Sequence, residues 1–212
     1  IGGIIGIHIP HPELSLPIGL SFYTFRNLSY LFDIYLSKVS AQRNFLTFAV
    51  YSTMFPYTSA GPIVRYTDIE TQLKQRTINI SKFGIGAELF VKGLAKKVLL
   101  ADNLSVLYSS ICGHPQMSVF TSWLGILAYT MQLYFDFSGY SDMAIGLGKM
   151  LGFDFNKNFD YPYISTSVSE FWRRWHISLG SWFRDYIYIP LGGNRVSTLK
   201  HIRNILVVWA LT

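Results

Sequence analysis

Long stretches without charge constrain this chain more than any other feature. Asn44 to Val64 is 21 residues without a charged side chain, bracketed by Arg43 and Arg65. Asn103 to Phe135 is a second such stretch, 33 residues in which His114 is the only acidic or basic residue. A membrane-crossing helix needs about 20 apolar residues. With only 14% charged residues overall, the chain is predicted to be an all-α, polytopic transmembrane helical bundle with amphipathic or re-entrant helices.

The first predicted crossing, Leu16 to Leu36, contains two opposite charges. Arg26 and Asp33 are seven residues apart, and therefore lie on nearly the same face of a helix. Because charge inside a membrane segment is costly unless paired, the two side chains could stabilise each other. Alternatively, Arg26 extends its guanidinium to the lipid headgroups. Both interpretations stay open.

The second predicted crossing is interrupted. Pro56, Gly61 and Pro62 fall inside Asn44 to Val64, and proline lacks the N–H that a helix interior needs. Either the helix breaks where it lines a cavity, or it ends near Pro56.

Met117 to Phe135 is the clearest predicted crossing, and the small-residue run DFSGYSDMAIGLG follows it. Small residues let helices approach closely in lipid. Asp136 and Asp142, with Tyr134 and Tyr140, form either half of a polar lining or a set of helix-end groups.

The polar segment Thr67 to Ser81 is predicted to be a loop, and Phe83 to Asn103 an amphipathic or short re-entrant helix. Its three lysines suit an anionic cytoplasmic leaflet. The net charge of +6 is carried by residues that flank apolar stretches, which argues against a nucleic-acid-binding protein.

The ends of the chain suggest a single domain, residues 1–212, truncated on both sides. The chain opens at Ile1 on an apolar run and stops at Thr212 inside another. His8 and His11 stand at helical spacing, but the prolines around them favour a loop over a metal site.

The stretch from Ser165 to Arg195 places one histidine, His176, among arginines and tryptophans. Ser167 and Glu170 form a capping-box pattern that predicts a helix starting near Val168. On a continuous helix, the aromatic side chains share one face and three arginines share the other. His176 would then lie on the border between them. The arginines are Arg173, Arg174 and Arg184.

This position favours a neutral imidazole, because positive neighbours and partial desolvation both disfavour the charged form. A neutral His176 could act as a general base on a hydroxyl acceptor during acyl transfer, while Arg173 and Arg174 favour an anionic donor or acceptor group. The alternative is an interfacial histidine packed among tryptophans.

Four sequence blocks resemble one family. They are AGPIVRY, GLAKKVLLADNL, YTMQLYFDFSGYSDMAIGLGKMLGF and FWRRWHISLGSWFRDYIYIPLGGNR. In this order they are similar to the membrane-bound O-acyltransferase (MBOAT) family, most closely to its alginate O-acetyltransferase branch. The resemblance runs from about Leu16 to Thr212.

The resemblance implies a multi-pass enzyme of the bacterial plasma (inner) membrane. It would pass acetyl groups from cytoplasmic acetyl-CoA, with no bound cofactor or metal, towards an alginate-like or peptidoglycan acceptor. An extracytoplasmic SGNH-hydrolase-like acetyltransferase partner would complete the transfer. The RRWH histidine of the family corresponds to His176, which we assign as catalytic. A second family histidine would fall just past Thr212, so the chain alone is expected to be inactive.

Five further residues are assigned to substrate binding: Arg173, Arg174, Trp175, Asp136 and Tyr140. Two other functions remain in competition. A transporter or channel could use the same intramembrane polar groups without covalent chemistry. D-alanyl transfer to teichoic acid is the other, although IPLGGNR resembles the acetylating branch more closely.

Overall fold

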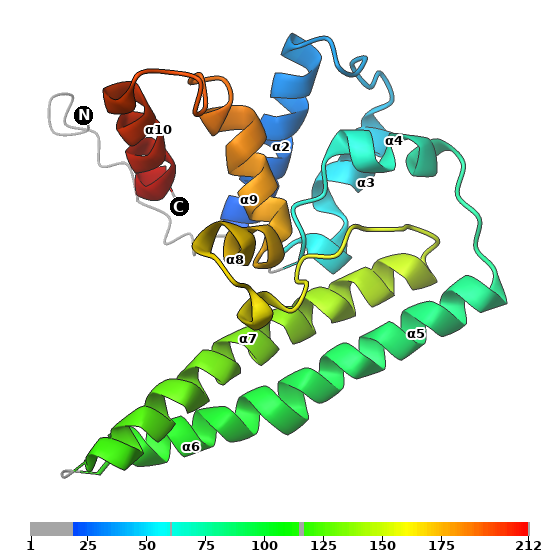
Figure 1. The fold of residues 1–212 in the computed structure, drawn as a ribbon. Coiled ribbons are helices and arrows are strands. Elements are labelled where there is room, and N and C mark those ends of the chain that lie inside the picture. Colours follow the sequence, from blue (N-terminus) through cyan, green and yellow to red (C-terminus); the bar gives the residue numbers. More distant parts are fainter. Residues whose placement is uncertain (1–18, 60, 115–116, 212) are drawn as a thin grey trace, which may run out of the picture.

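The computed structural model describes residues 19–59, 61–114 and 117–211, and the regular secondary structure of this part of the chain consists of helices joined by loops, without strands. It consists of a long helical hairpin and a body of shorter helices that packs on one side of it (Figure 1). The body comprises α2 (Leu20–Tyr35), α3 (Phe45–Thr53), η1 (Phe55–Tyr57), α4 (Tyr66–Lys74), η3 (Pro162–Ile164), α8 (Val168–Arg174), α9 (Ile177–Phe183), η4 (Arg184–Tyr188) and α10 (Thr198–Leu211).

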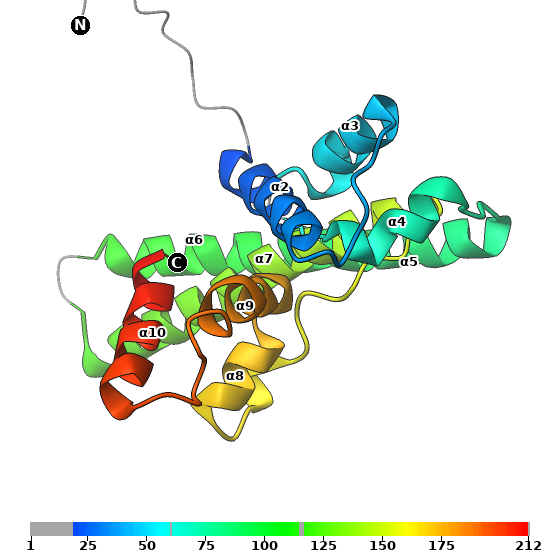
Figure 2. The same ribbon diagram turned by 90° about the horizontal axis from the view of Figure 1, so that it is seen from above.

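The hairpin has two antiparallel arms. One runs without interruption through α5 (Ile80–Ala95), the π-helical segment η2 (Lys96–Ala101) and α6 (Asp102–Cys112), and the other is α7 (Val119–Met150). Viewed from above, α2 and α3 lie towards one side of this hairpin and α8 and α10 towards the other (Figure 2). The predicted helix at Phe83 to Asn103 is therefore part of a longer one.

Glycines bring the two arms into backbone contact. A Cβ atom added to Gly93 would lie 2.5 Å from the carbonyl oxygen of Gly139, and one added to Gly86 would lie 2.7 Å from that of Gly146. No real side chain tolerates such distances, so these positions require glycine. The expectation that the small-residue run permits close helix packing is confirmed.

Asp136 and Asp142 lie inside α7 rather than at its end, so the helix-end interpretation is wrong. The helix that we expected to stop near Phe135 continues to Met150. Each aspartate pairs with a lysine of η2. Lys97 Nζ is 2.7 Å from Asp136 Oδ1, and Lys96 Nζ is 2.6 Å from Asp142 Oδ2.

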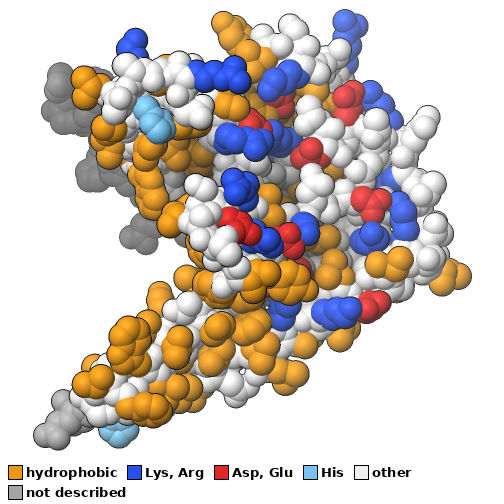
Figure 3. All heavy atoms as spheres, viewed as in Figure 1, with side chains coloured by type: hydrophobic (Ala, Val, Ile, Leu, Met, Phe, Trp, Pro, Cys, Tyr) orange, Lys and Arg blue, Asp and Glu red, His pale blue; other side chains and the backbone are white. Residues whose placement is uncertain are grey.

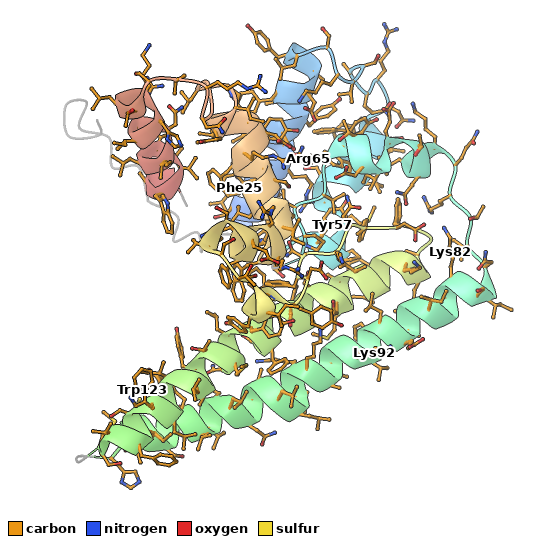
Figure 4. The ribbon with its side chains drawn as sticks, in the orientation of Figure 1. Phe25, Tyr57, Arg65, Lys82, Lys92 and Trp123 are labelled. Atoms are coloured by element: carbon orange, nitrogen blue, oxygen red, sulfur yellow. The ribbon has the colours of Figure 1, made fainter. Side chains whose placement is uncertain are left out.

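The body has an aromatic core. Tyr30, Tyr51, Tyr57 and Tyr66 pack with Ile69 in one cluster. A second cluster joins α9 and η4 to the loop before α4, and its members are Ile63, Trp182, Phe183 and Tyr186. Figure 4 shows Phe25, Tyr57 and Arg65 within this body.

Arg26 stabilises the end of α3 from inside the body. α3 ends at Thr53, before Pro56, and leaves its last carbonyls without helical partners. The fully buried Arg26 donates to the carbonyl oxygens of Ser52 at 2.7 Å and Tyr57 at 2.8 Å. A cation at a helix C-terminus is also favoured by the helix dipole.

Both interpretations of Arg26 and Asp33 are therefore wrong, although the two residues are buried on one helix as predicted. Arg26 does not reach solvent, and its partners are main-chain carbonyls. Asp33 accepts a hydrogen bond from the Tyr186 hydroxyl at 2.8 Å and lies 3.4 Å from Lys38 Nζ.

The loop predicted for Thr67 to Ser81 is also wrong, because α4 occupies its first half. Asp68 Oδ2 accepts the Arg65 backbone N–H at 3.1 Å at the start of this helix. Tyr66, Ile69 and Leu73 pack into the body core at helical spacing, an apolar period that the polar composition hides.

Exposed apolar side chains cover the far part of the hairpin, whereas charged side chains gather over the body (Figure 3). Trp123, near the tip of the hairpin in Figure 4, is 63% exposed. Judged by length and hydropathy together, no helix in the described part of the chain qualifies as a membrane span. The predicted crossings stay predictions. His8 and His11 lie outside the described residues.

Candidate functional site

The helix that leads to His176 starts where the capping pattern predicts. Ser167 Oγ accepts the Glu170 N–H at 3.1 Å, and α8 begins at Val168. The Glu170 carboxylate reaches back to the Thr166 N–H at 3.0 Å rather than to Ser167. Hydrogen bonds from Thr166, and then from Arg174, lower the pKa of Glu170 to about 2. The start of α8 is therefore held by a charged cap.

The continuous helix predicted through His176 is wrong. α8 ends at Arg174, Trp175 is extended, and His176 adopts a left-handed conformation with φ 43° and ψ 54° before α9 begins at Ile177. A side chain with a Cβ atom adopts this conformation at a cost of about 1–3 kcal/mol, and such residues cluster at functional sites. The histidine thus stands at a break between two short helices.

Three loop residues, Asn158 to Asp160, hold this break, and we call them the 158–160 clasp. The backbone oxygen of Asn158 accepts the Ile177 N–H at 2.9 Å, and its Oδ1 accepts the Ser178 N–H at 3.1 Å. On the other side of the break, the Asp160 N–H donates to the Arg174 carbonyl at 2.9 Å. The clasp therefore ties together the end of α8 and the start of α9.

His176 is enclosed by two phenylalanines. The Phe137 ring of α7 meets the imidazole edge-to-face at a centroid distance of 4.7 Å, and the clasp residue Phe159 lies parallel to it at 6.4 Å. The histidine is 9% exposed, and within the described residues its Nε2 atom has no hydrogen-bond partner. Burial lowers the pKa of His176 to about 4. The predicted neutral imidazole is confirmed, with burial rather than positive neighbours as the cause.

The predicted cationic face does not form beside His176, because the helix breaks there. Arg173 is exposed on α8. Arg174 Nη2 is 2.8 Å from Glu170 Oε1, and Arg184 Nε is 2.7 Å from Asp185 Oδ1. Two of the three arginines are therefore committed to carboxylates. The role of Arg173 and Arg174 in substrate binding stays a prediction.

Of the remaining predicted substrate-binding residues, only Trp175 belongs to the aromatic cluster around His176. Its ring meets that of Phe159 at 5.1 Å. Asp136 is paired with Lys97, and the Tyr140 hydroxyl contacts Ser59 Oγ. Asp136 therefore faces η2, whereas Tyr140 lies on the same face of α7 as Phe137, one turn further on, and contacts the segment after η1 instead of His176. The structure therefore joins Trp175 to His176 and separates Asp136 and Tyr140 from it.

Sequence reasoning missed Phe137, Asn158 and Phe159. Asn158 is 1% exposed, whereas Asn156, two residues earlier in the same polar loop, is exposed. Nothing in the sequence distinguishes these two asparagines. In the sequence, Phe137 stands out only as part of a small-residue run, although its position on α7 is what brings it into contact with the histidine.

A cavity of about 390 Å³ lies beside the start of α9 and is lined by Ile177 and Ser178 but not by His176. One wall carries the ion pair between Arg65 Nη1 and Asp185 Oδ2 at 2.8 Å. Burial alone would raise the pKa of Asp185, but hydrogen bonds from Arg184 and Arg65 lower it. Among the described residues, no group of three histidine, cysteine or acidic side chains could hold a metal ion.

Comparisons with known proteins agree on one family. The family model of the membrane-bound O-acyltransferases matches residues 16–211. The chain is 51% identical over 199 residues to the protein named probable alginate O-acetylase AlgI of Pseudomonas aeruginosa, covering 94% of this chain and 38% of that protein.

More distant relatives have related names. The peptidoglycan O-acetyltransferase of Helicobacter pylori is 35% identical over 234 residues, which cover 96% of this chain and 44% of that protein. The teichoic acid D-alanyltransferase of Bacillus subtilis is 30% identical over 194 residues, which cover 86% of this chain and 47% of that protein. The chain thus spans less than half the length of these curated relatives.

Proposed function

The chain belongs to the membrane-bound O-acyltransferase family, and from this membership we propose that it serves the O-acetylation of a cell-surface or exported polysaccharide. Its greater identity to an alginate O-acetylase than to a D-alanyltransferase, 51% against 30%, supports acetyl over D-alanyl transfer. Acetyl-CoA is the proposed donor, and an alginate-like polymer or peptidoglycan the proposed final acceptor. We further propose that the protein lies in the bacterial inner membrane and that an extracytoplasmic SGNH-hydrolase-like partner completes the transfer.

The observation that carries this function is the neutral, buried imidazole of His176. Because burial lowers its pKa to about 4, the ring is unprotonated at neutral pH, and its nitrogen is free to act as a proton acceptor. The ring stands between Phe137 and Phe159, so its orientation is restricted. Nε2, which has no partner among the described residues, is the nitrogen left for the substrate.

The reaction then follows from the chemistry of a thioester donor. An acceptor hydroxyl oxygen attacks the acetyl carbonyl carbon while its proton passes to Nε2 of His176. The tetrahedral intermediate collapses, the C–S bond breaks, and the thiolate takes the proton back from the imidazolium. The acetyl ester and the free thiol leave, and His176 returns to its neutral form.

The neighbouring residues support this step in different ways. The aromatic cluster of Trp175, Phe137 and Phe159 excludes water, which would otherwise hydrolyse the thioester. Arg173, exposed on α8, is the remaining candidate for contact with an anionic group of donor or acceptor. Arg174, Asp136 and Tyr140 would have to exchange their present partners to bind substrate.

The test is the variant His176→Ala in the complete protein, with labelled acetyl-CoA and its partner proteins present. We expect glycan acetylation to fall by about 10² to 10⁴-fold, the usual contribution of a general base. His201→Ala, which changes a histidine of α10 outside the aromatic cluster, is the matched control. Normal acetylation by His176→Ala at normal abundance would refute the assignment, and uptake of acetyl groups without covalent attachment would favour a transporter.

A further inference from the structure

Two buried serines on α7 lack hydrogen bonds. Ser138 and Ser141 are 0% and 1% exposed, and the Oγ atom of each has no partner among the described residues. Other hydroxyls of this helix bond to the carbonyl one turn earlier, as Ser122 Oγ does to Ser118 O and Thr130 Oγ1 to Ile126 O. A buried hydroxyl without a partner is costly. Its presence twice on one helix therefore calls for an explanation.

These serines lie next to the part of α7 that contacts His176. Ser141 is four residues after Phe137 and three after Ser138, so Ser141 is a neighbour of both on the surface of the helix. Phe137 itself touches the imidazole. The two hydroxyls therefore stand within about one helical turn, roughly 6 Å, of the side chain that forms one wall of the histidine site.

The loop that carries the clasp passes along the same stretch of α7 (Figure 1). Phe155 packs at Gly148, where an added Cβ atom would lie 2.1 Å from its ring, and Phe159 packs at Phe137 with ring centroids 5.0 Å apart. Asn158 lies between these two anchors in the chain, and it accepts hydrogen bonds from Ile177 and Ser178, directly after His176. Its Nδ2 is also buried and without a partner among the described residues.

The side chains of Ser138, Ser141, Asn158 and His176 are thus all buried in the region where α7 meets the clasp, next to the contacts that Phe137 makes with Phe159 and His176. Three of the four supply N–H or O–H donors, and none is a cation. Donors without charge, in an enclosed site, match a neutral oxygen that becomes negative during the reaction. A carbonyl oxygen under nucleophilic attack has this property, whereas a phosphate or carboxylate would lack a counter-charge here.

We infer that the amide of Asn158 and the hydroxyls of Ser138 and Ser141 donate hydrogen bonds to the carbonyl oxygen of the acyl group while His176 accepts the proton of the attacking hydroxyl. This inference rests on the proposed function, since it names the group that this site binds. In the resting protein these donors have no partner within the part of the chain that the structure describes, and they bond to the carbonyl oxygen in the transition state, when that oxygen carries negative charge. The oxygen loses this charge when the C–S bond breaks.

Alanine at the serines separates this role from a structural one. Ser141→Ala and Ser138→Ala each remove a hydroxyl that has no protein partner, so the melting temperature of the complete protein should stay constant or rise. Acetyl transfer should nevertheless slow, with kcat falling about 2- to 10-fold for each serine and KM for acetyl-CoA little changed. Ser122→Ala, on the same helix, is the control and should leave kcat unchanged.

Asn158→Asp is the second variant, because it keeps the Oδ1 atom that accepts from Ser178 and removes the Nδ2 donor. We expect a larger loss of kcat than for either serine and an acidic limb of the pH–rate profile displaced to higher pH, since a carboxylate favours imidazolium. The displaced limb would report that position 158 lies near the imidazole, and the loss of kcat tests the missing donor.

The outcomes distinguish the inference from the function on which it rests. Unchanged kcat in both serine variants, with normal transfer by the wild type, would overturn the inference alone. A lower melting temperature with unchanged kcat would show that the hydroxyls hold internal water, and would overturn it as well. Absence of acetyl transfer by the wild type would overturn both proposals.

Discussion

The hairpin and the body of this molecule place their polar groups in opposite ways. In the hairpin, the helices meet through glycine backbones, and the charged side chains stay partly exposed, as Lys92 does at 64% on the outer side of α5 (Figure 4). In the body, Arg26 and Asp33 are buried to 1% exposure or less and are held by hydrogen bonds. One region is joined by close contact of backbones, and the other by buried polar bonds.

The candidate site lies where these two regions meet. α7 contributes Phe137 from the hairpin, while the clasp and His176 belong to the body. The histidine is therefore placed between a rigid helix and a hydrogen-bonded turn. Substitutions in the hairpin should act through the backbone contacts of its helices, and substitutions in the body through buried hydrogen bonds. Three measurements can test this contrast.

The largest effect is expected for Arg26→Met in the body. The change removes the donors to the carbonyls of Ser52 and Tyr57, which have no helical partners, and should cost about 3–5 kcal/mol of stability. Thermal or denaturant unfolding of the purified protein would measure it. Arg43→Met removes an exposed arginine of the same charge and should change stability by less than about 0.5 kcal/mol. Equal effects of the two variants would show that buried polar bonds do not hold the body.

The second effect is a pH dependence that originates in His176. Its pKa is about 4 in the folded protein against about 6.5 in the unfolded chain, so the unfolded state binds the proton more readily between these values. The stabilising effect of the neutral ring is complete above pH 6.5 and is lost as the pH falls towards 4. The loss should reach roughly 3 kcal/mol.

Chemical unfolding at several pH values would measure this loss, with His176→Phe as the variant that has no titrating ring. The difference in unfolding free energy between wild type and variant should shift steadily from pH 6.5 to pH 4. A constant difference over that range would mean that the imidazole is not buried in solution.

The smallest of the three effects is expected for Gly93→Ala in the hairpin, and it has a diagnostic sign. Alanine normally stabilises a helix interior by about 0.5–1 kcal/mol relative to glycine. At Gly93 the new Cβ atom would meet the Gly139 oxygen at 2.5 Å, so we expect a loss of about 1–3 kcal/mol instead. Gly84→Ala, on the same helix with open space around its Cβ position, should give the normal gain. Gains in both variants would show that the arms are not in backbone contact.

The sequence predicted the helices better than it predicted their partners. Local signals suffice for the start of α8, because Ser167 and Glu170 act within one turn. The break at His176 was missed because its cause is distant, namely the bonds from Asn158, 18 residues earlier. The sequence suggested Asp33 as the partner of Arg26 because charge pairing can be expected from side chains alone. The actual partners are backbone carbonyls, which are free to accept only because α3 ends.

The glycine contacts have a last consequence, for the register of the hairpin. Gly86 and Gly93 on α5 are seven residues apart, and so are Gly139 and Gly146 on α7. Both glycine pairs therefore meet only in the observed register, because a shift of one helix along the other replaces at least one of these glycines with a residue whose side chain would meet a carbonyl. The matched glycine spacing therefore fixes the register of the two helices. It fixes the position of α7, and therefore of Phe137, relative to α5. In this way α5 influences the surroundings of His176, which packs against the opposite side of α7.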